Sequence, residues 1–142
     1  MKAGATDRIV LDASIVMAWC FDDESTPITE RLLDLASTGA EIVVPAIWPF
    51  EVANALLVAE RRKRISVAQA TVFLSRIGRY AVSVEETPAS QAFGEILALA
   101  RQHSLTVYDA AYLELALRRA LPLATLDDDL RHAAKRVGIL LA

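Results

Sequence analysis

The sequence predicts an α/β fold in which a parallel sheet is covered by helices on both faces. Short β-prone apolar runs alternate with longer segments in which apolar residues recur at helical spacing. Strands that alternate with helices usually lie parallel, because each helix carries the chain back across a face of the sheet. We therefore expect four strands, and a fifth at the edge if residues 139–141 pair.

Each expected strand is a short run rich in β-branched or other apolar residues. The first ends on Asp12, and Pro45 stops the second. The four strands are expected at Arg8–Asp12, Glu41–Val44, Ala81–Val84 and Leu123–Leu126.

The expected helices are placed by their start signals and their apolar spacing. Thr26 before Pro27 is typical of a cap followed by a first-turn proline, and Ser66 with Gln69 has the spacing of a capping box. A second cap-and-proline pair, at residues 87–88, begins another helix. The helices are expected at about residues 15–19, 27–36, 48–62, 66–77, 88–100, 106–120 and 128–137.

Length and composition are those of one domain. The chain has 142 residues without a linker-like shift in composition, so we expect a single domain over residues 1–142, with Met1 to Asp7 as a flexible leader. No apolar run approaches the length of a membrane span, which predicts a cytoplasmic protein. Cys20 is the only cysteine, which excludes an internal disulfide and a Cys-based zinc site. The apolar content of 54% predicts a contact surface for a partner or a second copy.

Four acids stand at element ends that meet at one end of the predicted sheet. Asp12 and Asp127 follow strands directly, whereas Glu51 and Asp109 lie in the first turns of helices that enter from the same end. Each has a local structural alternative. Ser14 can cap the helix behind Asp12, Glu51 can complement a helix dipole, Thr106 with Asp109 fits a capping box, and one of residues 127–129 must cap the last helix.

Four carboxylates in one place would repel one another unless a cation lay between them. Oxygen ligands without a nearby His or Cys favour Mg²⁺ or Mn²⁺, which keeps open positions for water and phosphate oxygens. Such an ion lowers the pKa of bound water and stabilises the charge that develops on an attacked phosphodiester. The acids therefore indicate hydrolytic phosphoryl transfer.

Four motifs together carry a family resemblance. They are Leu-Asp-Ala-Ser from Leu11, Glu-Val-Ala-Asn-Ala-Leu from Glu51, Tyr-Asp-Ala-Ala-Tyr-Leu from Tyr108 and Leu-Ala-Thr-Leu-Asp from Leu123. In this order the set resembles the PIN-domain ribonucleases, most closely a VapC-type toxin of a toxin–antitoxin pair. The resemblance implies a Rossmann-like three-layer α/β/α PIN domain, Mg²⁺- or Mn²⁺-dependent endoribonuclease activity on RNA, a homodimer, and inhibition by a cognate antitoxin whose tail enters the active-site groove.

The resemblance also assigns residues. The family's four acids match, in chain order, Asp12, Glu51, Asp109 and Asp127. The supporting hydroxyl and amide positions match Ser14, Thr125 and Asn54. Asp12 and Asp109 are the first candidates for metal ligands, while Glu51 and Asp127 bind a second ion or orient the attacking water. Asp128 is an alternative to Asp127 as the fourth acid.

A basic run is the candidate for RNA binding. The net charge is −3, to which the four candidate acids contribute −4, so the rest of the chain carries +1. The run consists of Arg61, Arg62, Lys63 and Arg64 and could hold RNA phosphates. The alternative is a solvated helix end, where cations complement the dipole. Trp48 and Phe50 are interpreted as core residues or dimer anchors rather than base-stacking platforms.

Competing functions make different predictions. A haloacid-dehalogenase-like phosphatase would need a second Asp two residues after Asp12, where this chain has Ser14. The sequence has no glycine-rich phosphate loop. A non-catalytic PIN-like module that binds RNA or protein would be expected to lack one or more of the acids, and all four are present. A PIN nuclease that is not a toxin remains the second alternative.

Overall fold

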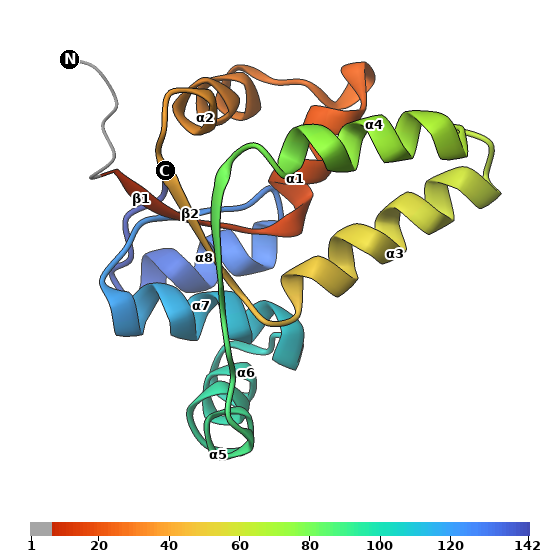
Figure 1. The fold of residues 1–142 in the computed structure, drawn as a ribbon. Helices are drawn as coiled ribbons and strands as arrows, with labels where there is room; N and C mark the ends of the chain where they lie inside the picture. The colour runs from red at the N-terminus through yellow and green to blue at the C-terminus, as the bar shows by residue number, and fades with distance from the viewer. Residues whose placement is uncertain (1–6) are drawn as a thin grey trace.

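The computed structural model describes residues 7–142 and is built on a four-stranded, all-parallel sheet (Figure 1). The strands are β1 (Arg8–Leu11), β2 (Glu41–Pro45), β3 (Ala81–Glu85) and β4 (Leu123–Ala124). Their order in the sheet is β3-β2-β1-β4. The predicted parallel sheet is confirmed, and in place of a fifth strand a single bridge joins Leu141 to Leu123.

The strand β4 is shorter than predicted, since it ends at Ala124 rather than at Leu126. The physical reason lies in the next two residues, which bond to side chains beyond β1 instead of extending the ladder. The hydroxyl of Thr125 donates to Asp12, and the N–H of Leu126 donates to Ser14.

Ten helical segments connect and flank the strands in residues 7–142. They are α1 (Ala13–Cys20), η1 (Asp22–Glu24), α2 (Pro27–Ser37), α3 (Trp48–Arg61), α4 (Val67–Ile77), α5 (Ala89–Gln91), η2 (Ala92–Ile96), α6 (Leu97–His103), α7 (Val107–Arg119) and α8 (Asp128–Arg136). The predicted starts at Thr26 and Ser66 are confirmed, because each residue caps a helix in a reciprocal capping box. The predicted cap at residues 87–88 is wrong, because Pro88 itself takes the N-cap position of α5 and has no side-chain donor or acceptor. The single helix expected at residues 88–100 is a continuous segment, α5-η2-α6, whose middle part is a π-helical turn.

The chain order of the strands puts helices on both faces. The connections from β1 to β2 and from β2 to β3 advance in one direction and carry α1 to α4, whereas the connection from β3 returns to β4 through α5 to α7. Right-handed crossovers therefore place the two sets on opposite faces, as Figure 1 shows. The central strands β1 and β2 are buried apart from their first residues, with Val10 and Val44 fully covered. This is the burial expected of a sheet with two covered faces.

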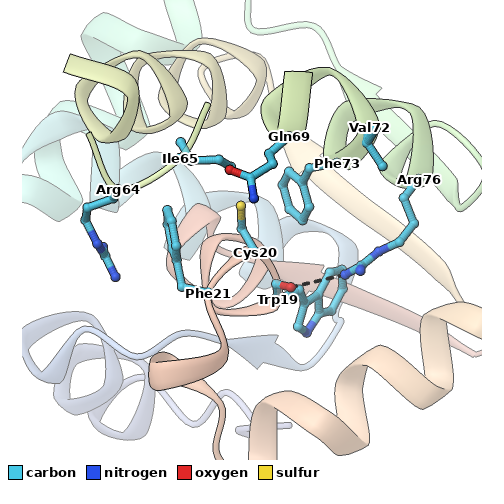
Figure 2. Close-up of a pocket in the computed structure, with 9 residues that line it drawn as sticks. All are labelled: Trp19, Cys20, Phe21, Arg64, Ile65, Gln69, Val72, Phe73 and Arg76. Carbon is cyan, nitrogen blue, oxygen red and sulfur yellow. Dashed lines mark hydrogen bonds between the residues drawn. The ribbon is translucent and has the colours of Figure 1, made fainter. Parts of the chain in front are cut away.

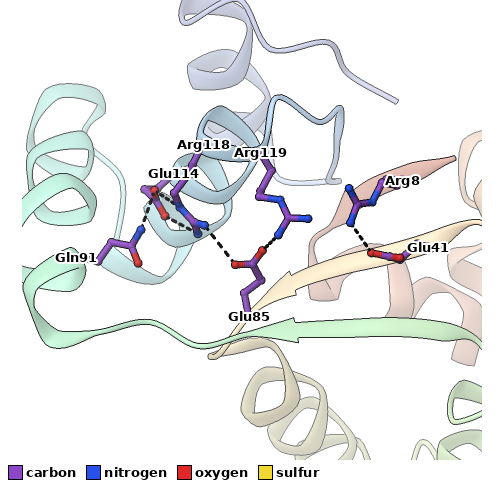
Figure 3. Close-up of polar contacts among 7 residues, drawn as sticks. All are labelled: Arg8, Glu41, Glu85, Gln91, Glu114, Arg118 and Arg119. Carbon is purple, nitrogen blue, oxygen red and sulfur yellow. Dashed lines mark hydrogen bonds and ion pairs between the residues drawn. The ribbon is translucent and has the colours of Figure 1, made fainter. Parts of the chain in front are cut away.

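A polar network fixes α7 against the neighbouring elements (Figure 3). Glu114, which is only 6% exposed, accepts hydrogen bonds from Arg118 at 2.9 Å and from Gln91 of α5 at 3.3 Å. Glu85, at the end of β3, pairs with Arg118 and Arg119. The network joins α5 and the end of β3 to the helix that carries Asp109.

Of the predicted leader, only Asp7 belongs to the described residues. Within residues 7–142, no helix combines the length and the apolar character that crossing a membrane would require.

Candidate active site

The site begins where β1 and β4 end side by side. Leu11 pairs with Ala124, and the N–H of Asp12 donates to the carbonyl of Ala124 at 2.9 Å. Asp12 and Thr125 therefore leave the sheet at the same level. In parallel sheets the crevice beyond the carboxyl ends of the strands is the usual place for a ligand.

Asp12 is held by two hydroxyl groups. Its Oδ2 accepts from Thr125 Oγ1 at 2.6 Å and from Ser14 Oγ at 2.9 Å. The same hydroxyl oxygens accept from the backbone N–H groups of Asp127 and Leu126. Asp12 is 6% exposed and Thr125 is 1% exposed, so this is a buried and well-partnered carboxylate. Both bonds use Oδ2, which leaves Oδ1 for another partner.

The capping alternative for Ser14 is wrong. Asp12 occupies the N-cap position of α1 and makes no side-chain cap, while Ser14 lies inside the helix. The hydroxyl of Ser14 instead bridges Asp12 and Leu126. Ser14 therefore links the residues that follow β1 and β4.

Glu51 enters the site from the first turn of α3. Its Oε1 accepts a hydrogen bond of 2.5 Å from the hydroxyl of Tyr112 on α7. Burial raises the pKa of Glu51, the Tyr112 bond lowers it, and the negative charges of Asp12 and Asp109 raise it further. Interaction with the dipole of α3 is therefore not the whole role of Glu51, because the charges of two other candidate acids, Asp12 and Asp109, act on it.

Asp109 is the third residue of α7, and its backbone N–H donates to the capping hydroxyl of Thr106 at 3.1 Å. Burial raises the pKa of Asp109 to about 6, and the negative charges of Asp12, Asp127 and Asp129 contribute. Thr106 does cap the helix, as the structural alternative predicted, but the carboxyl of Asp109 lies among other acids.

Asp127 is the N-cap of α8, and its Oδ2 accepts from the N–H of Leu130 at 2.9 Å. The predicted cap within residues 127–129 is therefore Asp127 itself. Its charge also acts on Asp109. Of the two acids that follow, Asp129 contributes to the charge around Asp109, and Asp128 does not.

The four predicted acids thus lie close enough at one end of the sheet for their charges to interact, although their carboxylates do not surround a common point. Within residues 7–142, no three His, Cys, Asp or Glu side chains stand close enough together to hold a metal ion. The donor set nevertheless fits a hard divalent cation, since all four groups are carboxylates. Burial is the main cause of the raised pKa values of Glu51 and Asp109, and the neighbouring carboxylates add to it; a cation would offset both effects by favouring the charged forms.

One predicted residue lies apart from this cluster. Asn54 is exposed one turn beyond Glu51 and takes no part in the hydrogen bonds around Asp12 and Glu51. In contrast, Tyr112 is central to the site and received no role from the sequence. Its spacing of three residues after Asp109 places the two on one face of a helix, which is the signal that could have found it.

The basic run lies at the other end of α3 from Glu51, about 15 Å away along the helix axis. Arg64 pairs with Asp23 and Glu24 and stands 4.0 Å above the ring of Phe21. All four members are exposed, but only Arg64 makes these contacts. Arg64 is thus a structural residue, and the RNA-binding prediction rests on the other three.

A pocket of about 260 Å³ lies between the end of α1 and α4, away from the acids (Figure 2). Cys20 points into it, and Arg76 donates to the carbonyl of Trp19 at 3.2 Å. Burial raises the pKa of the Cys20 thiol. A thiol with a raised pKa is a poor nucleophile at neutral pH, so this pocket is not a cysteine-based active site.

A family model and a known relative each match most of the chain. Residues 9–136 match the family model described as the PIN domain. The chain is 30% identical over 123 residues to ribonuclease VapC3 of Pyrobaculum aerophilum, covering 87% of this chain and 92% of that protein.

Solved structures with the same fold come from three organisms. The crystal structure of PAE2754 from Pyrobaculum aerophilum has a TM-score of 0.69 and 25% identity, over 96% of this chain and 83% of that one. VapBC2 from Rickettsia felis, bound to a DNA fragment from its promoter, has a TM-score of 0.64 at 16% identity, over 95% and 97% of the two chains. FitAcB from Neisseria gonorrhoeae has a TM-score of 0.63 at 15% identity, over 94% and 95%.

Proposed function

The chain belongs to the PIN-domain family, and from this premise we propose that it is a metal-dependent endoribonuclease that hydrolyses RNA phosphodiester bonds. The observation that carries the proposal is the grouping of Asp12, Glu51, Asp109 and Asp127, in which burial first and neighbouring negative charges second raise the pKa values of Glu51 and Asp109. The relative with 30% identity is itself named a ribonuclease. Retention of all four acids favours catalysis over a binding-only module.

The four carboxylates are the residues that would hold Mg²⁺ or Mn²⁺. When bound, such a cation lowers the pKa of water and stabilises the negative charge on the phosphate under attack. Asp12 is the central ligand in this proposal, because two hydroxyls fix it and leave Oδ1 available. Asp109 is the second ligand, and a nearby positive charge would offset the burial and the negative charges that raise its pKa.

The other residues have supporting roles in the reaction. Glu51 and Asp127 orient the attacking water or complete the coordination, and each keeps one oxygen outside its structural hydrogen bond. Ser14 and Thr125 hold Asp12, and Asn54 contacts the RNA chain beside the site. The exposed residues 61–63 bind RNA phosphates further along α3.

We further propose that the protein is the cytoplasmic toxin of a VapBC-type pair, inhibited by a cognate antitoxin and active as a homodimer. The relationship to ribonuclease VapC3 and the fold shared with VapBC2 and FitAcB support this. Phe50 and Phe93, at 73% and 77% exposure, offer apolar surface for a second copy, whereas Trp48 is a core residue. A PIN nuclease outside toxin–antitoxin systems is the alternative.

The decisive test is cleavage of a mixed RNA pool by antitoxin-free protein. We expect cutting with Mg²⁺ or Mn²⁺, none with EDTA, and none by Asp109→Asn purified in the same way. Equal cutting by the variant would reveal a contaminating nuclease or a wrong site. If folded, inhibitor-free protein cuts no RNA, the binding-only module becomes the better description. Growth arrest on expression, relieved by the adjacent gene, would separate the toxin from other PIN nucleases.

A further inference from the structure

Tyr112 connects the helix that carries one candidate acid, Asp109, to the side chain of another, Glu51. The side chain is fully buried, with 0% exposure, and lies one turn after Asp109 on α7. Its hydroxyl donates to Oε1 of Glu51 on α3 at 2.5 Å. One residue thus links the helix that carries Asp109 to the side chain of Glu51.

The chemistry of the hydroxyl makes it a constant donor. A tyrosine hydroxyl keeps its proton at neutral pH, because its ordinary pKa is about 10. The neutral hydroxyl can donate one hydrogen bond, and Glu51 accepts it.

Glu51 needs such a partner more than Asp12 and Asp127 do. Asp12 and Asp127 have shorter side chains and are held by the hydroxyls and the backbone N–H described above. Glu51 has one more rotatable bond, and the hydrogen bond from Tyr112 is the contact that restricts it. Restricting a side chain before a ligand arrives removes part of the entropy cost of binding.

We propose that Tyr112 is a positioning residue, which orients the Glu51 carboxylate toward the divalent cation by occupying Oε1 and leaving Oε2. The inference rests on the proposed function for the identity of the cation. Partners that orient metal ligands typically change metal affinity or activity by about 10- to 100-fold when they are removed. The hydroxyl of Tyr112 should therefore matter for metal binding even without RNA.

The first test compares Tyr112→Phe with Tyr108→Phe. Tyr108 lies on the preceding turn of α7 and is 58% exposed. Tyr108→Phe is the matched control, because it removes the same hydroxyl group at an exposed position. Mn²⁺ affinity is measured without RNA, from the rise of Tm with Mn²⁺ concentration and by calorimetry. We expect about 10-fold weaker Mn²⁺ binding for Tyr112→Phe and unchanged binding for Tyr108→Phe. A merely structural Tyr112 would lower the Tm without metal and leave the Mn²⁺ affinity unchanged, which would overturn the proposal.

The second test asks whether Tyr112 acts through Glu51. In a Glu51→Gln background, Tyr112→Phe should cause no further loss of Mn²⁺ affinity, because coupled residues are not additive. Two additive losses would contradict the inference. If Tyr112→Phe fails to fold, Glu51→Asp replaces it in the test. The shorter side chain moves the carboxylate away from the hydroxyl while Tyr112 stays in the core, so Glu51→Asp should also weaken Mn²⁺ binding. Unchanged affinity in Glu51→Asp would count against the inference.

These measurements separate the inference from the proposed function. If the parent binds Mn²⁺ but cuts no RNA, the nuclease proposal fails and the role of Tyr112 is still decided by the affinities. If the folded parent binds no divalent cation, both are overturned.

Discussion

Thr125 Oγ1 donates to Asp12 Oδ2 at 2.6 Å, across the junction where β4 and β1 end together. The same oxygen of Thr125 accepts from the backbone N–H of Asp127 at 3.0 Å. One buried hydroxyl therefore fixes the first acid and the backbone of the fourth, which lie 115 residues apart in the chain. This hydroxyl therefore holds the residues after the two neighbouring strands, β1 and β4, in fixed positions relative to each other.

The first prediction concerns that hydroxyl. Thr125→Val keeps the shape of the side chain but leaves Asp12 with one donor fewer and the N–H of Asp127 without its acceptor. We expect a loss of about 1–3 kcal/mol in the free energy of unfolding, measured with urea. The control is Thr71→Val, where the hydroxyl is exposed and bonds only to the carbonyl of Val67. Equal losses in the two variants would show that the buried hydroxyl carries no special role.

The second prediction concerns the pH dependence of stability through Asp109. Its pKa rises from 3.8 to about 6 on folding, so between these values the folded state binds more protons than the unfolded state. Stability contributed by Asp109 therefore falls as the pH rises through this range. Because Asp109 is only partly buried, we expect Asp109→Asn to be more stable than the parent by about 1 kcal/mol above pH 6. Urea unfolding at pH 7.5 and at pH 4 measures the difference, which should vanish at the lower pH. A variant less stable than the parent at pH 7.5 would contradict the raised pKa.

The third prediction concerns the cation. At 100 times its dissociation constant, Mn²⁺ should stabilise the parent by about 2.7 kcal/mol, and EDTA should reverse the effect. The increment should shrink as the pH falls below about 6, since protonation of Asp109 removes a ligand. Asp12→Asn, which keeps the size of the side chain, is expected to lose most of the increment. A stabilisation that is equal in this variant would place the ion elsewhere.

Local pattern predicted much of the fold, and it predicted the four acids. The strands β1 and β2, the caps Thr26 and Ser66 and the parallel pairing follow from residues close together in the chain. The early end of β4 and the bridging role of Ser14 could not be predicted in this way, because both depend on hydrogen bonds between residues 12–14 and 125–126, which are far apart in the chain. Tyr112 was missed for a related reason. Its apolar ring fits a buried helix face, and only the tertiary structure brings its hydroxyl to Glu51.

The fourth prediction concerns the basic run. Arg61, Arg62 and Lys63 are exposed, whereas Arg64 is paired with Asp23 and Glu24. Changing the first three to Ala should weaken RNA binding and reduce its salt dependence, by up to about 0.7 in the log–log slope for each phosphate of single-stranded RNA that the protein no longer neutralises. Arg64→Ala should instead lower stability. Binding is measured by fluorescence anisotropy at several salt concentrations with a catalytically inactive Asp109→Asn parent. An unchanged salt slope in the triple variant would assign the run to a solvated helix end.

The fifth prediction separates the two roles of Asp127, which caps α8 and contributes charge beside Asp109. Asn is as good an N-cap as Asp, so Asp127→Asn should keep stability within about 0.5 kcal/mol, whereas Asp127→Ala should lose about 1 kcal/mol. If Asp127 is the fourth acid, both variants should lose RNA cleavage, because both remove the charge. Asp128→Asn and Asp129→Asn, made in the same way, test the neighbouring acids. Full cleavage by Asp127→Asn together with loss in one of these two would move the fourth position to that residue, and Asp129 is then favoured by its charge contribution at Asp109.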